Sequence, residues 1–431
     1  MEPAMMPASP FELAAIVSVT AAVLGWINYH LLPLPNAIGL TVLGAALSGA
    51  LLVANAFAPG LQLDNMVKAL LAQTDFSQTL LEGMLSFLLF AGALHVNLRA
   101  LRAEWLPVLL LSTLGVILST VIVGFMMFAA MQLIGIGLPL IWCLVFGALI
   151  APTDPVSVLG IMKQMKVPPL LQATVSGESL FNDGVGIVVF TILLGAAASG
   201  QDFSFAKGAH LFIVEAGGGL LVGLAAGSIA FLALRSMDDY PMEVLITLAV
   251  VMGGYALCNR LHLSGPLAMA VAGLLIGNMG TRYAMSEVTR DYLIKFWEVV
   301  DELLNAGLFL LIGLEVIAIV PALDELWIAL VAVPVTLLAR TIAVRVSLLA
   351  VRITRGRQPA ARRVLIWGGL RGGISIALVL TIDAGTVRDL LLAATFAAVL
   401  FSVLVQRATL GPLIDRAKAE IDASKKIRAN P

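Results

Sequence analysis

Long apolar runs, separated by short clusters of charged residues, proline and glycine, make up most of this chain of 431 residues. A helix needs about 20 predominantly apolar residues to cross the hydrocarbon core of a bilayer. Cutting the chain at the polar clusters by this rule predicts thirteen transmembrane helices. They span residues 11–33, 35–58, 78–98, 105–134, 139–163, 169–199, 208–234, 241–260, 263–279, 296–320, 324–352, 363–383 and 386–412. Residues 62–75 have the pattern of an amphipathic helix at the membrane surface.

The composition supports a membrane protein. Hydrophobic residues make up 60% of the chain and charged residues 12%, whereas about 25% of the residues of a soluble protein are charged. The first apolar stretch, from Phe11, has neither a basic flank nor a small-residue cleavage site, so we expect a retained helix and not a signal peptide. Cys143 and Cys258 lie in separate apolar segments and the four histidines are scattered, which indicates neither a disulfide nor a metal enzyme. The predicted fold class is an all-α polytopic membrane protein.

The distribution of basic residues predicts the orientation. The loops after odd-numbered predicted helices, together with the C-terminal tail, contain eighteen Lys and Arg residues, and the loops on the opposite side contain four. Cytoplasmic loops are enriched in Lys and Arg, so this asymmetry places the C-terminus in the cytoplasm and the N-terminus outside. We expect one transmembrane domain, residues 1–412, followed by a short cytoplasmic tail, residues 413–431.

Several charged residues fall inside the predicted helices. Asp154 lies in the fifth helix, and Glu178 and Asp183 lie in the sixth. A carboxylate at the centre of a bilayer costs about 2.5 kcal/mol or more, so such groups face a protein interior or a watery cavity and mark function. Arg340 and Arg371 lie well inside late helices and need partners for the same reason.

The fifth segment contains the motif APTDP, in which Pro152 and Pro155 flank Thr153 and Asp154. Proline removes a backbone donor and disfavours helical geometry at the preceding residue, so this helix is predicted to break near mid-membrane. Irregular backbone at that depth is tolerated only where it faces protein or water. The freed carbonyls and both polar side chains would then face a cavity. A simpler interpretation is a proline kink in which Asp154 caps the following half-helix.

The twelfth segment has a second interruption, WGGLRGG, in which two glycine pairs flank Arg371. Paired interruptions are typical of secondary transporters with inverted repeats, which bind substrate at the midplane between two crossed, broken helices. With repeats of helices 2–7 and 8–13, the interrupted segments are the fourth and fifth of their halves and are not strictly equivalent.

The sixth segment carries polar residues at helical spacing. Ser179 and Asp183 are four residues apart and share a face, as do Glu178 and Asn182 on the neighbouring face. Hydroxyl and carboxylate oxygens are hard ligands for a cation, and a carboxylate also takes a proton. Glu178 is the natural partner of Arg340, and Asn182 can donate hydrogen bonds across the helix crossing.

Other interpretations stay open at this point. Glu178 can form a purely structural ion pair, and Asp183 can be a buried carboxyl group without a role in transport. Two intramembrane aspartates also fit an intramembrane aspartyl protease, but such an enzyme needs a Gly-x-Gly-Asp motif, and the order around Asp183 is Asn-Asp-Gly-Val-Gly. A cation channel or sensor built on a transporter fold is a further alternative.

Taken in order, TDPVSV, GESLFNDG, a lone arginine in a late helix and GGLRGGISIAL resemble the monovalent cation:proton antiporter-1 family, which includes the bacterial NhaP-type sodium/proton antiporters. The resemblance covers nearly the whole transmembrane chain. It implies that Asp183 carries the cation and the proton in turn, and that Ser179 and the Thr153 carbonyl are further Na⁺ ligands. Asp154 and Asn182 would link the two unwound helices.

The same resemblance implies supporting roles and an assembly. Glu178 would pair with Arg340, and Arg371 would hold the second unwound helix. The family fold is a homodimer in which a six-helix core, here around 139–199 and 324–412, moves against a dimerisation domain. No cofactor is expected beyond the transported Na⁺ and H⁺, and no nucleic acid partner.

The third predicted helix departs from the family pattern. Many relatives have an acidic residue there that contributes to the cation site, where this chain reads FLLFAGALHVN, with Ala91 and Gly92. Glu82 comes earlier in the helix. The fourth ligand and the preference among Li⁺, Na⁺ and K⁺ therefore stay open, and K⁺/H⁺ antiport is the main alternative.

Counting charges predicts the stoichiometry. If Asp183 binds either one cation or one proton, and the core moves only when loaded, each cycle exchanges one Na⁺ for one H⁺. Position 182 is Asn and not a second Asp, so we expect one carrier carboxylate and electroneutral exchange. Because the tail lacks the long regulatory region of eukaryotic relatives, the expected location is the cytoplasmic inner membrane of a bacterium.

Overall fold

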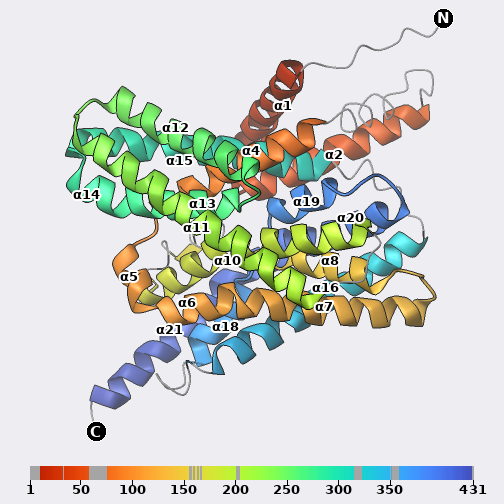
Figure 1. The fold of residues 1–431 in the computed structure, drawn as a ribbon. Helices are drawn as coiled ribbons and strands as arrows, with labels where there is room; N and C mark the ends of the chain where they lie inside the picture. The colour runs from red at the N-terminus through yellow and green to blue at the C-terminus, as the bar shows by residue number, and fades with distance from the viewer. Residues whose placement is uncertain are drawn as a thin grey trace, which may run out of the picture.

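The computed structural model describes residues 10–32, 34–57, 75–154, 167–199, 204–314, 323–349 and 359–429, with isolated positions within 158–165 and at 351. All regular secondary structure in these ranges is helical (Figure 1). Residues 62–74 of the predicted surface helix lie outside the described residues, as does the side chain of Glu82.

The helices are numbered in chain order. They are α1 (Pro10–Leu31), α2 (Asn36–Phe57), α4 (Asp75–Leu94), α5 (Leu98–Ala103), α6 (Trp105–Ser112), α7 (Leu114–Ile134), α8 (Leu140–Ile150), α10 (Pro169–Ser199), α11 (Phe205–Arg235), α12 (Tyr240–Arg260), α13 (Gly265–Leu275), α14 (Thr281–Tyr283), α15 (Glu287–Leu314), α16 (Leu323–Ser347), α18 (Pro359–Trp367), α19 (Gly373–Leu380), α20 (Thr386–Phe401) and α21 (Arg407–Ala429). Two π-helical turns, Ile276–Gly280 and Ser402–Gln406, follow α13 and α20.

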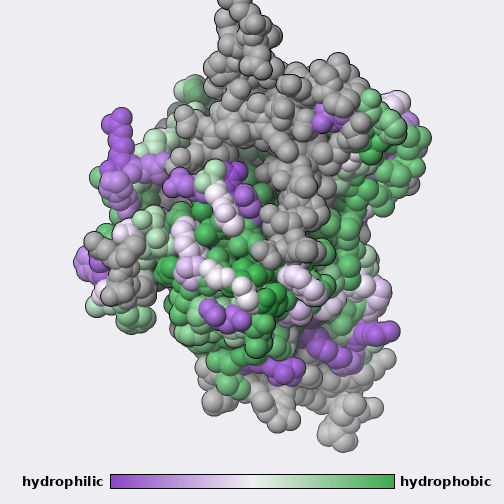
Figure 2. Space-filling model, turned by 90° about the vertical axis from the view of Figure 1, so that its right-hand side faces the viewer, coloured by the Kyte–Doolittle hydropathy of each residue, from purple (hydrophilic) through white to green (hydrophobic). Residues whose placement is uncertain are grey.

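Within these ranges, eight helical stretches are long and apolar enough to cross a membrane, and two shorter apolar helices, Gly83–Leu94 and Leu140–Ile150, accompany them. Exposed apolar side chains such as Leu133 and Leu221 cover the outer surface of α7 and α11. Among the described residues on the face shown in Figure 2, hydrophilic side chains form separate groups between apolar ones. Apolar surface of this extent needs a cover, which a bilayer provides, so the chain is an all-helical polytopic membrane protein.

Some helix boundaries differ from the predicted ones. The predicted helix 169–199 matches α10, but α15 begins at Glu287, well before the predicted start at 296. Its first turns are rich in charged residues, which a hydropathy rule excludes from a membrane span. The predicted helix 363–383 is divided into α18 and α19, and the last predicted helix does not end at 412 because α21 continues through Pro412 to Ala429.

The helices pack as two stacked groups (Figure 1). One core cluster joins side chains of α7, α8, α16 and α20, with Phe146 fully buried. A second joins α4, α12, α13 and α15, with Trp297 fully buried. A third ties α1 and α2 to α15 and α20. Helix α10 packs against α8 in the first group and against α13 in the second, which places its polar face at the junction.

Candidate functional site

Helix α10 places four polar side chains in the protein interior. Glu178, Ser179, Asn182 and Asp183 are each 2% exposed or less. Since residues four apart share a helix face, Ser179 lies beside Asp183 and Glu178 lies beside Asn182. Polar groups this deeply buried need partners, and those partners come from two interrupted segments elsewhere in the chain.

The first interruption follows α8, where the backbone from Ala151 to Asp154 is not helical. The Thr153 hydroxyl accepts a hydrogen bond of 2.8 Å from Asn182 Nδ2 and lies 2.8 Å from the Ser179 hydroxyl. The Ser179 hydroxyl donates to the Thr153 carbonyl, and the Thr153 N–H donates to Asn182 Oδ1 at 3.4 Å. Thr153 is thus held by α10 through its side chain and its backbone.

Asp183 differs from these neighbours because one of its oxygens is unpaired. Oδ1 is buried and has no hydrogen-bond partner among the described residues. A buried carboxylate without a partner is costly, so a bound proton or cation would stabilise it. Asp183 lies at the wall of a cavity of about 290 Å³ that Thr153 and Asp154 also line.

The second interruption, between α18 and α19, lies directly against the first. The Asp154 N–H donates to the Leu370 carbonyl at 2.8 Å, which joins the two non-helical segments through their backbones. Gly372 permits the approach, because a Cβ atom there would lie 2.8 Å from the Cβ of Asp154. The chain therefore departs from helical geometry at both motifs that the sequence singles out.

Arg371, in the second interruption, reaches across to the first. Its Nη1 donates to the carbonyls of Ala151, at 2.5 Å, and Pro152, at 2.9 Å, and its own N–H donates to the Ser402 hydroxyl at 2.8 Å. Carbonyls at the end of a helix lack intrahelical partners, and a cation is favourable there. Arg371 therefore stabilises the end of α8.

Arg340, on α16, makes an ion pair with Glu178 in the protein interior, the partner that residue type alone had suggested. Its Nη2 also donates to the Leu365 carbonyl of α18 at 2.8 Å. A Cβ atom at Gly369 would lie 2.5 Å from Arg340 Nε, so glycine is needed for the guanidinium to fit. This pair ties α10, α16 and α18 together beside the site.

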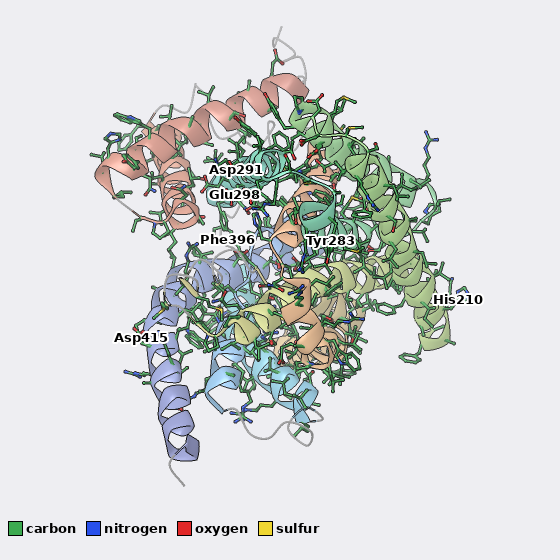
Figure 3. The ribbon with its side chains drawn as sticks, turned by 90° about the vertical axis from the view of Figure 1, so that its left-hand side faces the viewer. His210, Tyr283, Asp291, Glu298, Phe396 and Asp415 are labelled. Carbon is green, nitrogen blue, oxygen red and sulfur yellow. The ribbon has the colours of Figure 1, made fainter. Side chains whose placement is uncertain are left out.

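The cavity wall is acidic. The acidic residues that line it are Asp154, Asp183, Glu298 and Asp301, and the described lining residues include no Lys or Arg. Figure 3 shows Glu298 near the middle of the molecule, between the two groups of helices. Carboxylates that line a cleft in an otherwise apolar protein raise the local concentration of cations. The cavity therefore suits a positively charged ligand.

Several lining residues were not among the predicted site residues. Asp301 and Asn305 of α15 and Ser375 of α19 belong to this group. A signal was available for Asp301, which is a carboxylate inside the predicted helix 296–320. Nothing in the local sequence indicates that α15 and α19 face the same cavity.

Helix α4 contributes no carboxylate to the described cavity wall. Gly92 and His95 line the cavity, whereas Ala91 is fully buried in the second core cluster. Among the described lining residues, the segment around Ala91 and Gly92 therefore supplies no side-chain oxygen to the cavity.

Comparison with known proteins decides the family. Residues 18–416 match the family model described as sodium/hydrogen exchanger, transmembrane. The chain belongs to that family. Members of this exchanger family are transporters and not enzymes, so the alternative of an intramembrane aspartyl protease is wrong.

Individual relatives agree with the family. The Na(+)/H(+) antiporter NhaP of Pseudomonas aeruginosa is 44% identical over 409 residues, 94% of this exchanger-family chain and 96% of that protein. The Na(+)/H(+) antiporter NhaH of Halobacillus dabanensis is 35% identical over 348 residues, 79% of this chain and 83% of that protein. The solved structure of the sodium proton antiporter MjNhaP1 from Methanocaldococcus jannaschii has the same fold, with a TM-score of 0.75, 22% identity, and coverage of 94% of this chain and 97% of that one.

Proposed function

We propose that this protein exchanges Na⁺ for H⁺ across a membrane, with Asp183 as the carboxylate that binds each in turn. The observation that carries the proposal is the buried Oδ1 of Asp183, which has no hydrogen-bond partner in the described part of the chain and lies at the wall of an acidic cavity. Family membership and the similarity to proteins named Na(+)/H(+) antiporters support it.

The neighbouring hydrogen bonds suggest how a cation enters. The Ser179 hydroxyl now donates to the Thr153 carbonyl, so these two oxygens are already side by side. Rotation of that hydroxyl away from the carbonyl frees both oxygens for Na⁺ beside Asp183. Asn182 keeps Thr153 in place during this rotation, because the Asn182 amide donates to the Thr153 hydroxyl and accepts from the Thr153 backbone N–H.

The charges around Asp183 favour a ratio of one to one. The nearby arginines bind other groups, Arg340 pairing with Glu178 and Arg371 with backbone carbonyls. A single proton or a single Na⁺ then neutralises Asp183, so the loaded core has the same charge in both directions. Exchange is electroneutral and follows the two ion gradients.

The proposal includes the architecture inferred from the sequence. It comprises thirteen transmembrane helices with inverted repeats and two crossed, unwound helices, an outer N-terminus and a cytoplasmic C-terminus. The core around 139–199 and 324–412 moves against the remaining helices of residues 1–412, and 413–431 form the tail. The assembly is a homodimer in the inner membrane of a bacterium.

Purified protein in liposomes tests the proposal. With valinomycin and equal K⁺ on both sides to clamp the potential at zero, a Na⁺ gradient should drive proton movement, read with a pH-sensitive dye. Asp183→Asn should abolish the signal, while Ser199→Ala, an exposed site on the same helix, should retain it. Full exchange in Asp183→Asn would remove Asp183 from its role.

Parallel assays with Li⁺, Na⁺ and K⁺ at equal concentration separate the two antiport candidates. A response to Na⁺ and Li⁺ that exceeds the response to K⁺ supports Na⁺/H⁺ exchange. Valinomycin is left out of the K⁺ series because it carries K⁺ itself. A control with a protonophore then reports the membrane potential in that series. A preference for K⁺ would establish the alternative.

A further inference from the structure

The cavity that Asp183 lines is also lined by a second set of polar residues. Helices α15 and α19 pack against each other there. Asp301 and Asn305 of α15 and Ser375 of α19 line the cavity between them. None of these residues takes part in the hydrogen bonds that hold Thr153 and Asn182.

Ser375 is 1% exposed, and its hydroxyl has no hydrogen-bond partner among the described residues. Serines inside helices often bond the carbonyl four residues back, as Ser176 does with Gln172 at 2.8 Å. Ser375 lies in the first turn of α19, so the residue four positions back, Arg371, is outside the helix. This buried residue lines the cavity, and its hydroxyl, which no described residue bonds, is available to a ligand there.

Helix α15 presents a polar stripe to the same cavity. Glu298, Asp301, Asn305 and Leu308 all line it, and their spacing of three, four and three residues places them on one helix face. Glu298 is exposed, Asp301 and Asn305 are half-buried and Leu308 is buried. Asn305 brings an amide group to this face, and only its oxygen can bind a cation. The polar part of this face therefore runs inward from the exposed Glu298 to the half-buried Asn305, and the apolar Leu308 follows it.

We propose that Asp301, Asn305 and Ser375 form a second, outer cation position, at which a partly hydrated Na⁺ binds before it reaches Asp183. The inference rests on the proposed function, because it takes Asp183 as the inner position. The described lining residues of α4 include no carboxylate, and Asp301 of α15 supplies a negative charge to the same cavity.

The ligand chemistry favours a monovalent cation. Carboxylate, hydroxyl and amide oxygens are hard ligands, and a divalent ion such as Ca²⁺ takes about 6–8 oxygens, several of them carboxylates. Here one carboxylate is combined with neutral groups, and the cavity of about 290 Å³ has room for water to complete the shell. Weak binding of this kind lets the ion leave toward Asp183.

Equilibrium binding of ²²Na⁺ to the purified full chain in detergent tests the outer position directly. The unmodified protein should bind two Na⁺ per chain, and Asp183→Asn and Asp301→Asn should each bind one. Glu302→Gln is the matched control, because it removes an exposed carboxylate from the same turn of α15 that does not line the cavity. It should still bind two.

Transport gives a second readout. Asp301→Asn should raise the KM for Na⁺ about tenfold, which corresponds to a loss of about 1.4 kcal/mol of binding free energy. Its maximal rate should stay within about twofold of that of the unmodified protein. Ser375→Ala should raise the KM about threefold to tenfold without changing any charge, which separates a ligand from a merely electrostatic effect. If Asp301→Asn does not fold, the Ser375→Ala variant alone decides.

The two proposals fail separately. One Na⁺ per unmodified chain, together with a KM in Ser375→Ala equal to that of Glu302→Gln, overturns the outer position even if Asp183→Asn abolishes exchange. Exchange that persists in Asp183→Asn overturns the proposed function instead.

Discussion

The guanidinium of Arg371 donates a hydrogen bond of 2.5 Å to the carbonyl of Ala151, which is 220 residues away in the chain. Ala151 directly follows α8, which ends at Ile150, and the carbonyls at a helix end accept no hydrogen bond within the helix. A single side chain thus connects the two interruptions and satisfies carbonyls that would otherwise be buried without a partner.

Replacing Arg371 with alanine should therefore weaken the whole site. It leaves the Ala151 and Pro152 carbonyls unpaired, which costs about 1–3 kcal/mol for each buried group. We expect a lower melting temperature in detergent and loss of exchange in liposomes. Arg371→Lys keeps the charge but not the planar set of N–H donors. Its melting temperature and exchange activity should therefore lie between those of the unmodified protein and Arg371→Ala. Wild-type stability in Arg371→Ala would contradict this role.

Breaking the ion pair of Glu178 and Arg340 should be strongly destabilising. Its side chains are 3% and 8% exposed. Removing one partner of a buried pair leaves an uncompensated charge and costs about 3–5 kcal/mol. Glu178→Ala and Arg340→Ala should each be strongly destabilised in thermal melting, and the double variant should be less destabilised than the sum.

Arg363 and Glu420 provide the matched control. They form an ion pair of the same type, with side chains 46% and 50% exposed. Exposed pairs contribute about 0–1 kcal/mol, so Glu420→Ala should melt close to the unmodified protein. Equal effects at Glu178 and Glu420 would show that burial is not what makes the inner pair important.

Features that depend on residue type and helical spacing could be predicted from the sequence. The shared face of Ser179 and Asp183 follows from helical spacing, and the breaks at APTDP and GGLRGG follow from proline and glycine chemistry. The pairing of Glu178 with Arg340 follows from charge, since a buried cation needs an anion. These inferences need only residue types and local geometry.

Other features depend on which helices meet. The carbonyls bound by Arg371 carry no mark in the sequence, because every residue has one. Asp301, Asn305 and Ser375 lie on two helices that face one cavity only after folding. The early start of α15 at Glu287 was missed because a helix can extend beyond its apolar part. Such facts are set by tertiary packing.

Gly372 should tolerate no side chain. A Cβ atom would lie 2.8 Å from the Cβ of Asp154, closer than real atoms approach. Overpacking of this kind costs about 1–3 kcal/mol, and here it would separate the two joined backbones. Gly372→Ala should lower both the melting temperature and the exchange rate.

Gly253, inside α12, is the control for this substitution. A Cβ there would meet nothing within 4 Å. Alanine is favoured over glycine in a helix by about 1 kcal/mol, so Gly253→Ala should be neutral or slightly stabilising, with normal exchange. Normal exchange in Gly372→Ala would show that the interruptions can move apart without loss of function.

The final prediction concerns competition between the two ions for Asp183. Cation binding requires the deprotonated carboxylate, so Na⁺ binding releases a proton and weakens as the pH falls. Where the protonated form dominates, the KM for Na⁺ should rise about tenfold for each unit of pH decrease. The maximal rate at saturating Na⁺ should change much less, because excess Na⁺ displaces the proton. Initial rates in liposomes over a matrix of Na⁺ concentration and pH measure both quantities, with Glu302→Gln as a control that should follow the unmodified protein. A KM independent of pH, with a maximal rate that varies, would place the proton on a group other than the one that binds the cation.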